Sequence, residues 1–417
     1  MNRLQSYLRN WLAKAPTGQF WTYFCAGIFF NFGFSIFFFL FNIYLLGFGL
    51  DERALGLIGS CMAGGSLLST IPTGVFAERL GLRWTLTGGL TLAVAASVLR
   101  VCIPWQPAQL VLAVVSGMAL CINAVCLSPT VAALTTEQQR PFAFSLLCAS
   151  GIGVCGVGAL FAGWLPGWLS RPHELLHSTP MSLGQAERAT LLLACGSAAL
   201  AIFPMSRLTL RSATPRTRIV RPSTPFLLRF LPAMAVWGLV TGAFPPFANV
   251  YFVHHLGMSL QAMGSVFSLS QFVQFLAVLG APWLFRRMGL APGVMLTQLV
   301  TAILLVCLAN THTLASATWL YWAYLSAQNM NEPGIFSLLM NRVPADERNG
   351  ASSYTFFISS GSQLVASFAV GTEIVHFGYS TVLWSIACLA VVAALLFWRL
   401  SHLPETALTT PISPILS

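Results

Sequence analysis

One stretch of this sequence occurs twice. Residues 42–83 read NIYLLGFGLDERALGLIGSCMAGGSLLSTIPTGVFAERLGLR, and residues 249–290 read NVYFVHHLGMSLQAMGSVFSLSQFVQFLAVLGAPWLFRRMGL. Matching residues lie 207 positions apart at Asn42 and Asn249. They lie 208 apart from Gly49 and Gly257 onward, so one residue is inserted between these points.

The repeat continues beyond the two quoted copies. Arg140 corresponds to Arg348, and Gly153 corresponds to Gly361, at the same offset of 208. The second half of the chain therefore repeats the first half in parallel order. Internal repeats of this length are typical of transporters built from two similar membrane halves.

The composition is that of a membrane protein. Of 417 residues, 56% are hydrophobic and only 8% are charged, whereas soluble domains carry roughly a quarter charged residues. The net charge of +10 does not indicate a nucleic-acid partner, because the basic residues lie in short loops between apolar runs. Such residues orient a chain in the lipid bilayer.

About 20 apolar residues are needed to cross a bilayer as a helix. The apolar runs predict twelve spans, at about 19–47, 53–76, 84–104, 107–134, 141–168, 188–206, 226–253, 260–285, 291–310, 314–341, 350–377 and 380–400. Pro245 and Pro246 interrupt the seventh span, since proline removes a backbone hydrogen bond. An even number of spans places both termini on one side of the membrane.

The basic residues indicate which side that is. Loops on the terminal side carry 17 of the 21 basic residues, so both termini are predicted to be cytoplasmic. The expected location is the inner membrane of a bacterium. The predicted segments are an amphipathic segment at 1–18, a six-helix bundle at 19–206, an Arg-rich cytoplasmic linker at 207–225, a second six-helix bundle at 226–400 and a cytoplasmic tail at 401–417.

A motif closes the first copy of the repeat. The loop after the second span resembles Gly-x-x-x-Asp-Arg-x-Gly-Arg-Arg of the major facilitator superfamily, with Glu78 in place of the Asp and Leu82 in place of an Arg. The resemblance implies an all-α fold of two pseudo-symmetric six-helix bundles around a central cavity, working by alternating access. It also implies a cytoplasmic gate built from Gly74, Glu78, Arg79, Gly81, Arg83 and Arg140.

Polar residues inside spans are the candidates for substrate contact or coupling, because hydrocarbon penalises them. The candidates are Asn31, Asn123, Trp237, Gln271, Gln274, Tyr324, Gln328, Asn331, Glu332 and Gln363. The alternative for each amide is an interhelical hydrogen bond. For Trp237 and Tyr324 the alternative is packing in the core.

Glu332 is the acid placed deepest in a span. It lies nine residues before Asn341, about 13 Å along a helix, which is near the midplane of the bilayer. An ionised carboxylate at that depth is costly unless it is paired or hydrated. The sequence therefore predicts either proton coupling or direct substrate contact at Glu332, and leaves open a packing acid bonded to neighbouring polar groups.

The sequence contains no recognisable catalytic set. Neither a Gly-x-Ser-x-Gly elbow nor a Walker phosphate loop is present, and the ten cysteines form no Cys-x-x-Cys pair. We therefore expect no enzyme activity, no cofactor and no metal site.

Three functions remain open at this stage. Aromatic spans favour proton-coupled efflux of an amphipathic compound, whereas the Gln and Asn residues favour uptake of a small polar solute such as a sugar. A transport-dead receptor or scaffold is the third. In each case the expected partner is a small molecule, with protons in the coupled schemes, and the protein is expected to be a monomer.

Overall fold

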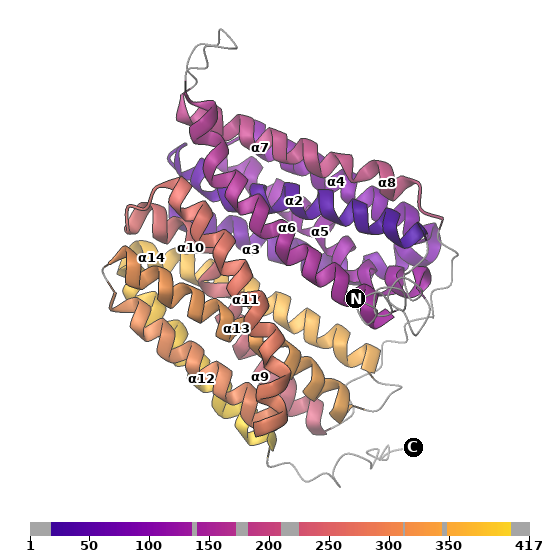
Figure 1. Ribbon diagram of the computed structural model, residues 1–417, viewed down its shortest axis with the longest axis vertical. Helices are drawn as coiled ribbons and strands as arrows, with labels where there is room; N and C mark the ends of the chain where they lie inside the picture. The colour runs from indigo at the N-terminus through magenta and orange to yellow at the C-terminus, as the bar shows by residue number, and fades with distance from the viewer. Residues whose placement is uncertain are drawn as a thin grey trace, which may run out of the picture.

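The computed structural model describes residues 18–135, 140–171, 182–209, 225–311, 313–343 and 348–401. Every regular element in these ranges is helical (Figure 1). The predicted amphipathic segment at 1–18, most of the linker at 207–225 and nearly all of the tail at 401–417 lie outside the described residues.

The first half of the chain forms a bundle, which is coloured indigo to magenta in Figure 1. Its helices are α2 (Gly18–Leu46), α3 (Glu52–Leu80), α4 (Leu82–Cys102), α5 (Gln106–Leu134), α6 (Arg140–Leu169), α7 (Leu183–Leu200) and α8 (Ile202–Ser206). Within it, α2 packs on α6 and α7, and α5 packs on α3 and α4.

The second half forms a similar bundle, coloured orange to yellow in Figure 1. Its elements are α9 (Pro225–Ala243), η2 (Pro245–Phe247), α10 (Ala248–Val250), η3 (Tyr251–His255), α11 (Leu260–Met288), α12 (Leu290–Ala309), α13 (Leu314–Arg342) and α14 (Arg348–Ser401). The break between α9 and η2 falls at the predicted proline pair. Within α14 the chain turns at Gly378, where φ is +78°, so α14 comprises two helices.

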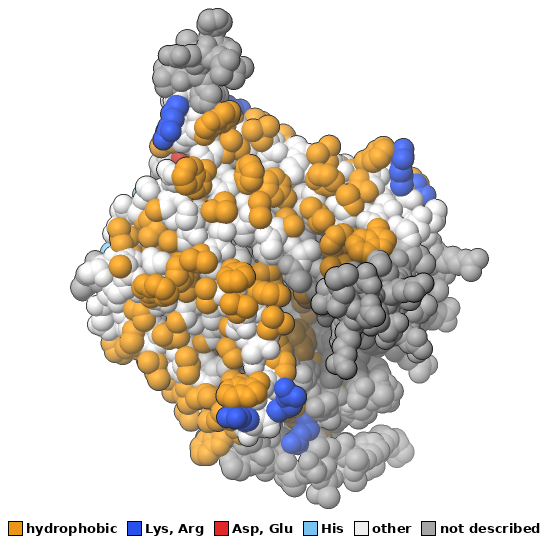
Figure 2. Space-filling view, in the orientation of Figure 1, with side chains coloured by type: hydrophobic (Ala, Val, Ile, Leu, Met, Phe, Trp, Pro, Cys, Tyr) orange, Lys and Arg blue, Asp and Glu red, His pale blue; other side chains and the backbone are white. Residues whose placement is uncertain are grey.

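Among the described residues, nine helices are long and apolar enough to cross a membrane, judged by length and composition. One of these candidates, Tyr354–Leu400, contains the two helices of α14. Two further helices, α3 and α13, each have 29 residues and are therefore as long as these candidates, but they are more polar. Together they are consistent with the twelve predicted spans. Figure 2 shows hydrophobic side chains over the visible flank, with Lys and Arg at its edges.

The sequence repeat reappears as repeated local geometry. Asp51 caps α3 by accepting a hydrogen bond from the backbone N–H of Ala54, and Ser259, 208 residues later, caps α11 in the same way. Gly81 and Gly289 end α3 and α11 with φ of +81° and +87°. This left-handed backbone favours glycine, which explains why glycine stands at both positions.

Candidate functional site

The two bundles meet along helix pairs from opposite halves. Helix α3 packs on α14, and α6 packs on α11. A Cβ built on Gly56 would lie 2.7 Å from the Cα of Gly371, and one built on Gly163 would lie 2.8 Å from the Cα of Gly264. The residues of the second contact match those of the first at the offset of 208. We call this side of the molecule, where α2 ends and α3 begins, the closed end.

Two hydrogen bonds between the halves also obey the repeat. The amide Nδ2 of Asn42 donates to the carbonyl oxygen of Pro246 at 2.9 Å. The amide Nδ2 of Asn249 donates to the carbonyl oxygen of Phe39 at 2.7 Å. Both donors and both acceptors are 207 residues apart, so each half supplies one donor and one acceptor. These bonds join α2 to the interrupted seventh span.

The halves separate toward the opposite side, which we call the open end. A Cβ built on Gly153 of α6 or on Gly361 of α14 would meet no atom of a described residue within 4 Å, although Gly163 and Gly371 on the same two helices are tightly packed. The same holds for a Cβ built on Gly74, near the end of α3. The described residues therefore adopt one state, closed at one end and apart at the other.

A cavity of about 530 Å³ lies between the bundles, beside the contacts of the closed end. That volume suits a small organic ligand. Its wall is mainly aromatic and apolar, with a few amides, hydroxyls and one charged side chain. The lining residues are Phe30, Asn31, Phe34, Ser35, Phe38, Phe39, Phe41, Asn42, Leu55, Ile58, Gly59, Met62, Arg100, Leu120, Cys155, Ala159, Pro245, Pro246, Phe247, Asn249, Phe267, Gln271 and Ser367.

Two of the predicted site residues line this cavity. Asn31 of α2 donates its Nδ2 to the carbonyl of Gly27 in its own helix, which leaves its side-chain oxygen for other partners. Gln271 of α11 has no hydrogen-bond partner among the described residues. Sequence reasoning missed Arg100, which lies near the end of the span predicted at 84–104. Arg100 is only 3% exposed and lines the cavity.

The other predicted residues are not among those that line the cavity. Trp237, Tyr324, Gln328 and Asn331 are buried in the second bundle, and Asn123 is half-buried on α5. Tyr324 packs against Phe244, with ring centroids 6.0 Å apart. The polar face of α13 is therefore turned into its own bundle.

A short polar network joins α11 to α13. Asn329 donates its Nδ2 to the side-chain oxygen of Gln274 at 2.8 Å, and Gln274 donates to Ser270 at 3.3 Å. Glu332 is exposed, unlike its buried neighbour Asn331. Gln363 of α14 is exposed as well, although its Cα and Cβ pack against Gly242.

The loop motif lies at the open end. Arg79 is exposed, and Arg83 is half-buried with its guanidinium 5.1 Å from the ring of Trp84. The side chains of Glu78 and Arg140 lie outside the described part of the structure. The predicted gate role of this motif, with Gly74 and Gly81, therefore stays a prediction.

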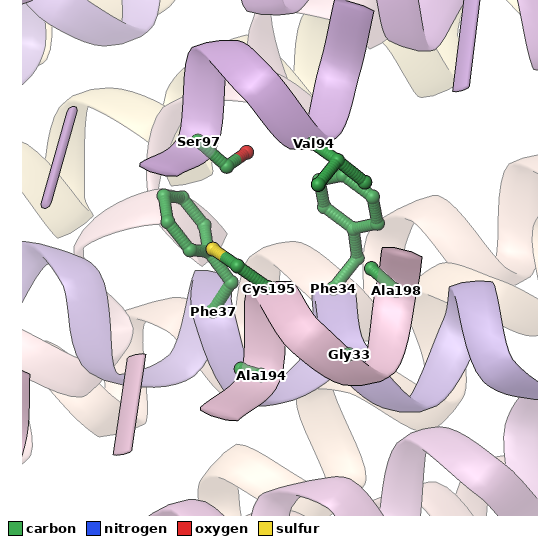
Figure 3. Close-up of a pocket in the computed structure, with 8 residues that line it drawn as sticks. All are labelled: Gly33, Phe34, Phe37, Val94, Ser97, Ala194, Cys195 and Ala198. Atoms are coloured by element: carbon green, nitrogen blue, oxygen red, sulfur yellow. The ribbon is translucent and has the colours of Figure 1, made fainter. Parts of the chain in front are cut away.

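A second hollow lies between α2, α4 and α7 and is a packing seam (Figure 3). It has no room for a water molecule, since its accessible volume is about 0 Å³. A Cβ built on Gly33 would lie 2.8 Å from the Cβ of Ala198, so the helices approach closely here. Within the described ranges, no three His, Cys, Asp or Glu side chains are grouped so that they could hold a metal ion.

Comparisons with known proteins agree with this architecture. The family model described as Major Facilitator Superfamily matches residues 23–367. A search of curated proteins found no match. Solved structures of similar fold include the nucleoside transporter NupG (TM-score 0.72, 12% identity, 93% of this chain and 100% of that one) and a bacterial homologue of the human lysosomal transporter Spinster, inward-facing and unoccupied (0.75, 14%, 95% and 100%).

A third similar structure is the xylose transporter XylE from E. coli in an inward-open conformation, with a TM-score of 0.71, 13% identity, and coverage of 93% of this chain and 98% of that one. At these identities the likeness shows the fold alone. The family match covers most of the sequence, and the helices, the repeat and the interfacial cavity fit it. The chain belongs to the major facilitator superfamily, as an integral multi-pass membrane protein with the fold of a transporter.

Proposed function

We propose that this protein is a secondary active transporter that moves a small amphipathic solute by alternating access. The observation that carries the proposal is the cavity of about 530 Å³, to which both bundles contribute and which is closed at one end by pseudo-symmetric contacts. Rocking one bundle against the other would break the closed end and bring the open ends of α3, α6, α11 and α14 together.

The wall composition favours an amphipathic solute. Seven phenylalanines line the cavity, and such rings offer apolar surface to a ligand. Uptake of a polar solute such as a sugar is the second candidate, favoured by the amides of Asn31 and Gln271. Solved structures of similar fold include a nucleoside transporter and a xylose transporter, so both kinds of solute should be tested.

We further propose that both termini are cytoplasmic, in a bacterial inner membrane, which would make this state inward-facing. The unequal number of basic residues in the loops on the two sides supports this orientation. A single cysteine at position 216 in a Cys-free background should react only from the cytoplasmic side. Reaction from outside would reverse the orientation. Proton coupling through Glu332 is part of the same proposal.

Binding and counterflow with the purified protein test the proposed function. Amphipathic compounds should raise the thermal midpoint, and the hits should exchange across proteoliposomes. Gln271→Ala should weaken binding by about fivefold, the value of one hydrogen bond. The matched control is Gln261→Ala, because Gln261 is an exposed residue of the same helix. Sugar binding without amphiphile binding would favour the second candidate, and binding without exchange would indicate a receptor.

A further inference from the structure

Arg100 is a buried cation beside the cavity. It lies in the last turn of α4 and is 3% exposed. Among the described residues that line the cavity, it is the one with a charged side chain. A buried charge is stable only when other groups replace its lost hydration, so its partners indicate its role.

Two sets of contacts hold the Arg100 guanidinium in place. Its Nε donates to the side-chain oxygen of Gln109 at 3.2 Å. Gln109, 0% exposed, is fixed in turn because its Nε2 donates to the carbonyls of Arg100 and Ile103, both at 2.7 Å. The guanidinium carbon lies 4.3 Å from the ring centroid of Phe41 and 5.8 Å from that of Phe37. These contacts orient the group, and the two rings attract its charge.

None of these contacts supplies a negative charge. No carboxylate of a described residue lies within ion-pairing distance of Arg100, and its terminal Nη groups have no protein acceptor there. Glu187, at the start of α7, is buried as well, but it does not pair with Arg100. The guanidinium is therefore held in a fixed orientation at the wall of the cavity, and no anionic side chain of a described residue balances its charge there.

From this geometry we infer that the transported solute is an organic anion with an aromatic or apolar body. Its carboxylate would accept hydrogen bonds from the Nη groups of Arg100, since a guanidinium matches a carboxylate in charge and shape. Its body would lie on the phenylalanine wall. This inference rests on the proposed transport function and adds the charge of the substrate to it.

Thermal-midpoint titrations of the purified protein test this inference with three carboxylates: benzoate, 4-phenylbutyrate and 2-naphthoate. Each is paired with its neutral amide, which has nearly the same shape. At least one carboxylate should bind about tenfold more tightly than its amide, the value of a charge-assisted hydrogen-bonded contact. Arg100→Gln should abolish this preference. Arg188→Gln, which removes an exposed charge at the same end, should retain it.

Should Arg100→Gln fail to fold, Arg100→Lys keeps the charge without the planar fork, and its carboxylate affinity should fall while its amide affinity does not. Carboxylate affinity equal to wild type in Arg100→Lys would exclude the guanidinium contact. The inference is overturned if no carboxylate is preferred by the wild type, or if Arg100→Gln keeps the preference. If amides bind and exchange without any carboxylate preference, only the anion inference fails. If nothing on the panel binds or exchanges, the proposal of an amphipathic solute fails too.

Discussion

Gly56 and Gly371 lie in backbone contact between the two halves of the molecule, and a Cβ on either would come within 2.7 Å of the other's Cα. Carbon atoms that are not bonded attract best at about 3.5–4.0 Å. No other residue type fits this contact without moving α3 away from α14. The pair is repeated by Gly163 and Gly264, so closure of this end depends on two symmetric glycine contacts.

Gly56→Leu should therefore open the closed end. Overpacking costs about 1–3 kcal/mol, which would shift the balance of states roughly 5- to 150-fold. Spin labels at Phe48 and His254, exposed on opposite halves at this end, should report a longer distance. Gly88→Leu is the control, because a Cβ there meets nothing within 4 Å. An unchanged distance in Gly56→Leu would show that the contact does not control closure.

The reciprocal hydrogen bonds should contribute to the same equilibrium. Asn42→Ala and Asn249→Ala each remove one bond between the halves, worth about 0.5–1.5 kcal/mol. Each variant should populate the longer distance between the same two labels, and the double variant more so. Asn310→Ala removes a bond to Val306 within a single helix and should have no effect. Identical distributions in all variants would contradict this role.

The loop motif should act in the opposite state. A Cβ built on Gly74 would meet no atom of a described residue within 4 Å, so Gly74→Leu should leave the present state undisturbed and hinder closure of the open end. We expect Gly74→Leu and Arg79→Ala to lower transport while membrane insertion stays normal. The distance between the two spin labels should not lengthen in either variant. Normal transport rates in both variants would remove the gate function assigned to this motif.

Asn331 differs from its neighbour Asn329 in its partners. Asn331 is 0% exposed, and neither of its side-chain amide atoms has a hydrogen-bond partner among the described residues. An unsatisfied buried polar group costs about 1–3 kcal/mol, so Asn331→Leu should leave the thermal midpoint unchanged or raise it. Asn329→Leu breaks the bond to Gln274 and should lower it. A loss of both stability and binding in Asn331→Leu would mean that another state uses this amide.

The sequence predicted the architecture well because the repeat and the apolar runs are local signals. The helix bounds lie within a few residues of the predicted spans, and the largest shift is at α7, which begins at Leu183 and not at 188. The glycines at 81 and 289 match in sequence and share a positive φ. Local sequence patterns of this kind therefore predict local backbone structure.

The site was less predictable, because a polar stripe reveals a helical face but not what that face contacts. The stripe of Tyr324, Gln328 and Asn331 is buried in its own bundle. Arg100 was missed for a related reason. Its burial depends on Gln109 of α5 and on Phe41 of α2, and neither contact can be read from the hydropathy of α4.

Glu332 provides the test of proton coupling. Its side chain is exposed and is not among those that line the cavity, so direct contact with a solute bound there is not expected in this state. A carboxylate on a span can instead bind and release a proton as the two halves move, because protonation removes a charge that hydrocarbon penalises. Glu332→Gln keeps the shape and imitates the protonated form.

We expect Glu332→Gln to bind solute with wild-type affinity and to exchange it between compartments of equal pH. Accumulation driven by a pH gradient should be lost, because the variant cannot carry the proton. Gln261→Glu, which adds a carboxyl group at an exposed position of α11, should retain gradient-driven transport and serves as the control. Loss of binding in Glu332→Gln would mean that the carboxylate contacts the solute in another state. Wild-type transport under a gradient would make Glu332 a packing residue, and coupling would then have to reside elsewhere in the chain.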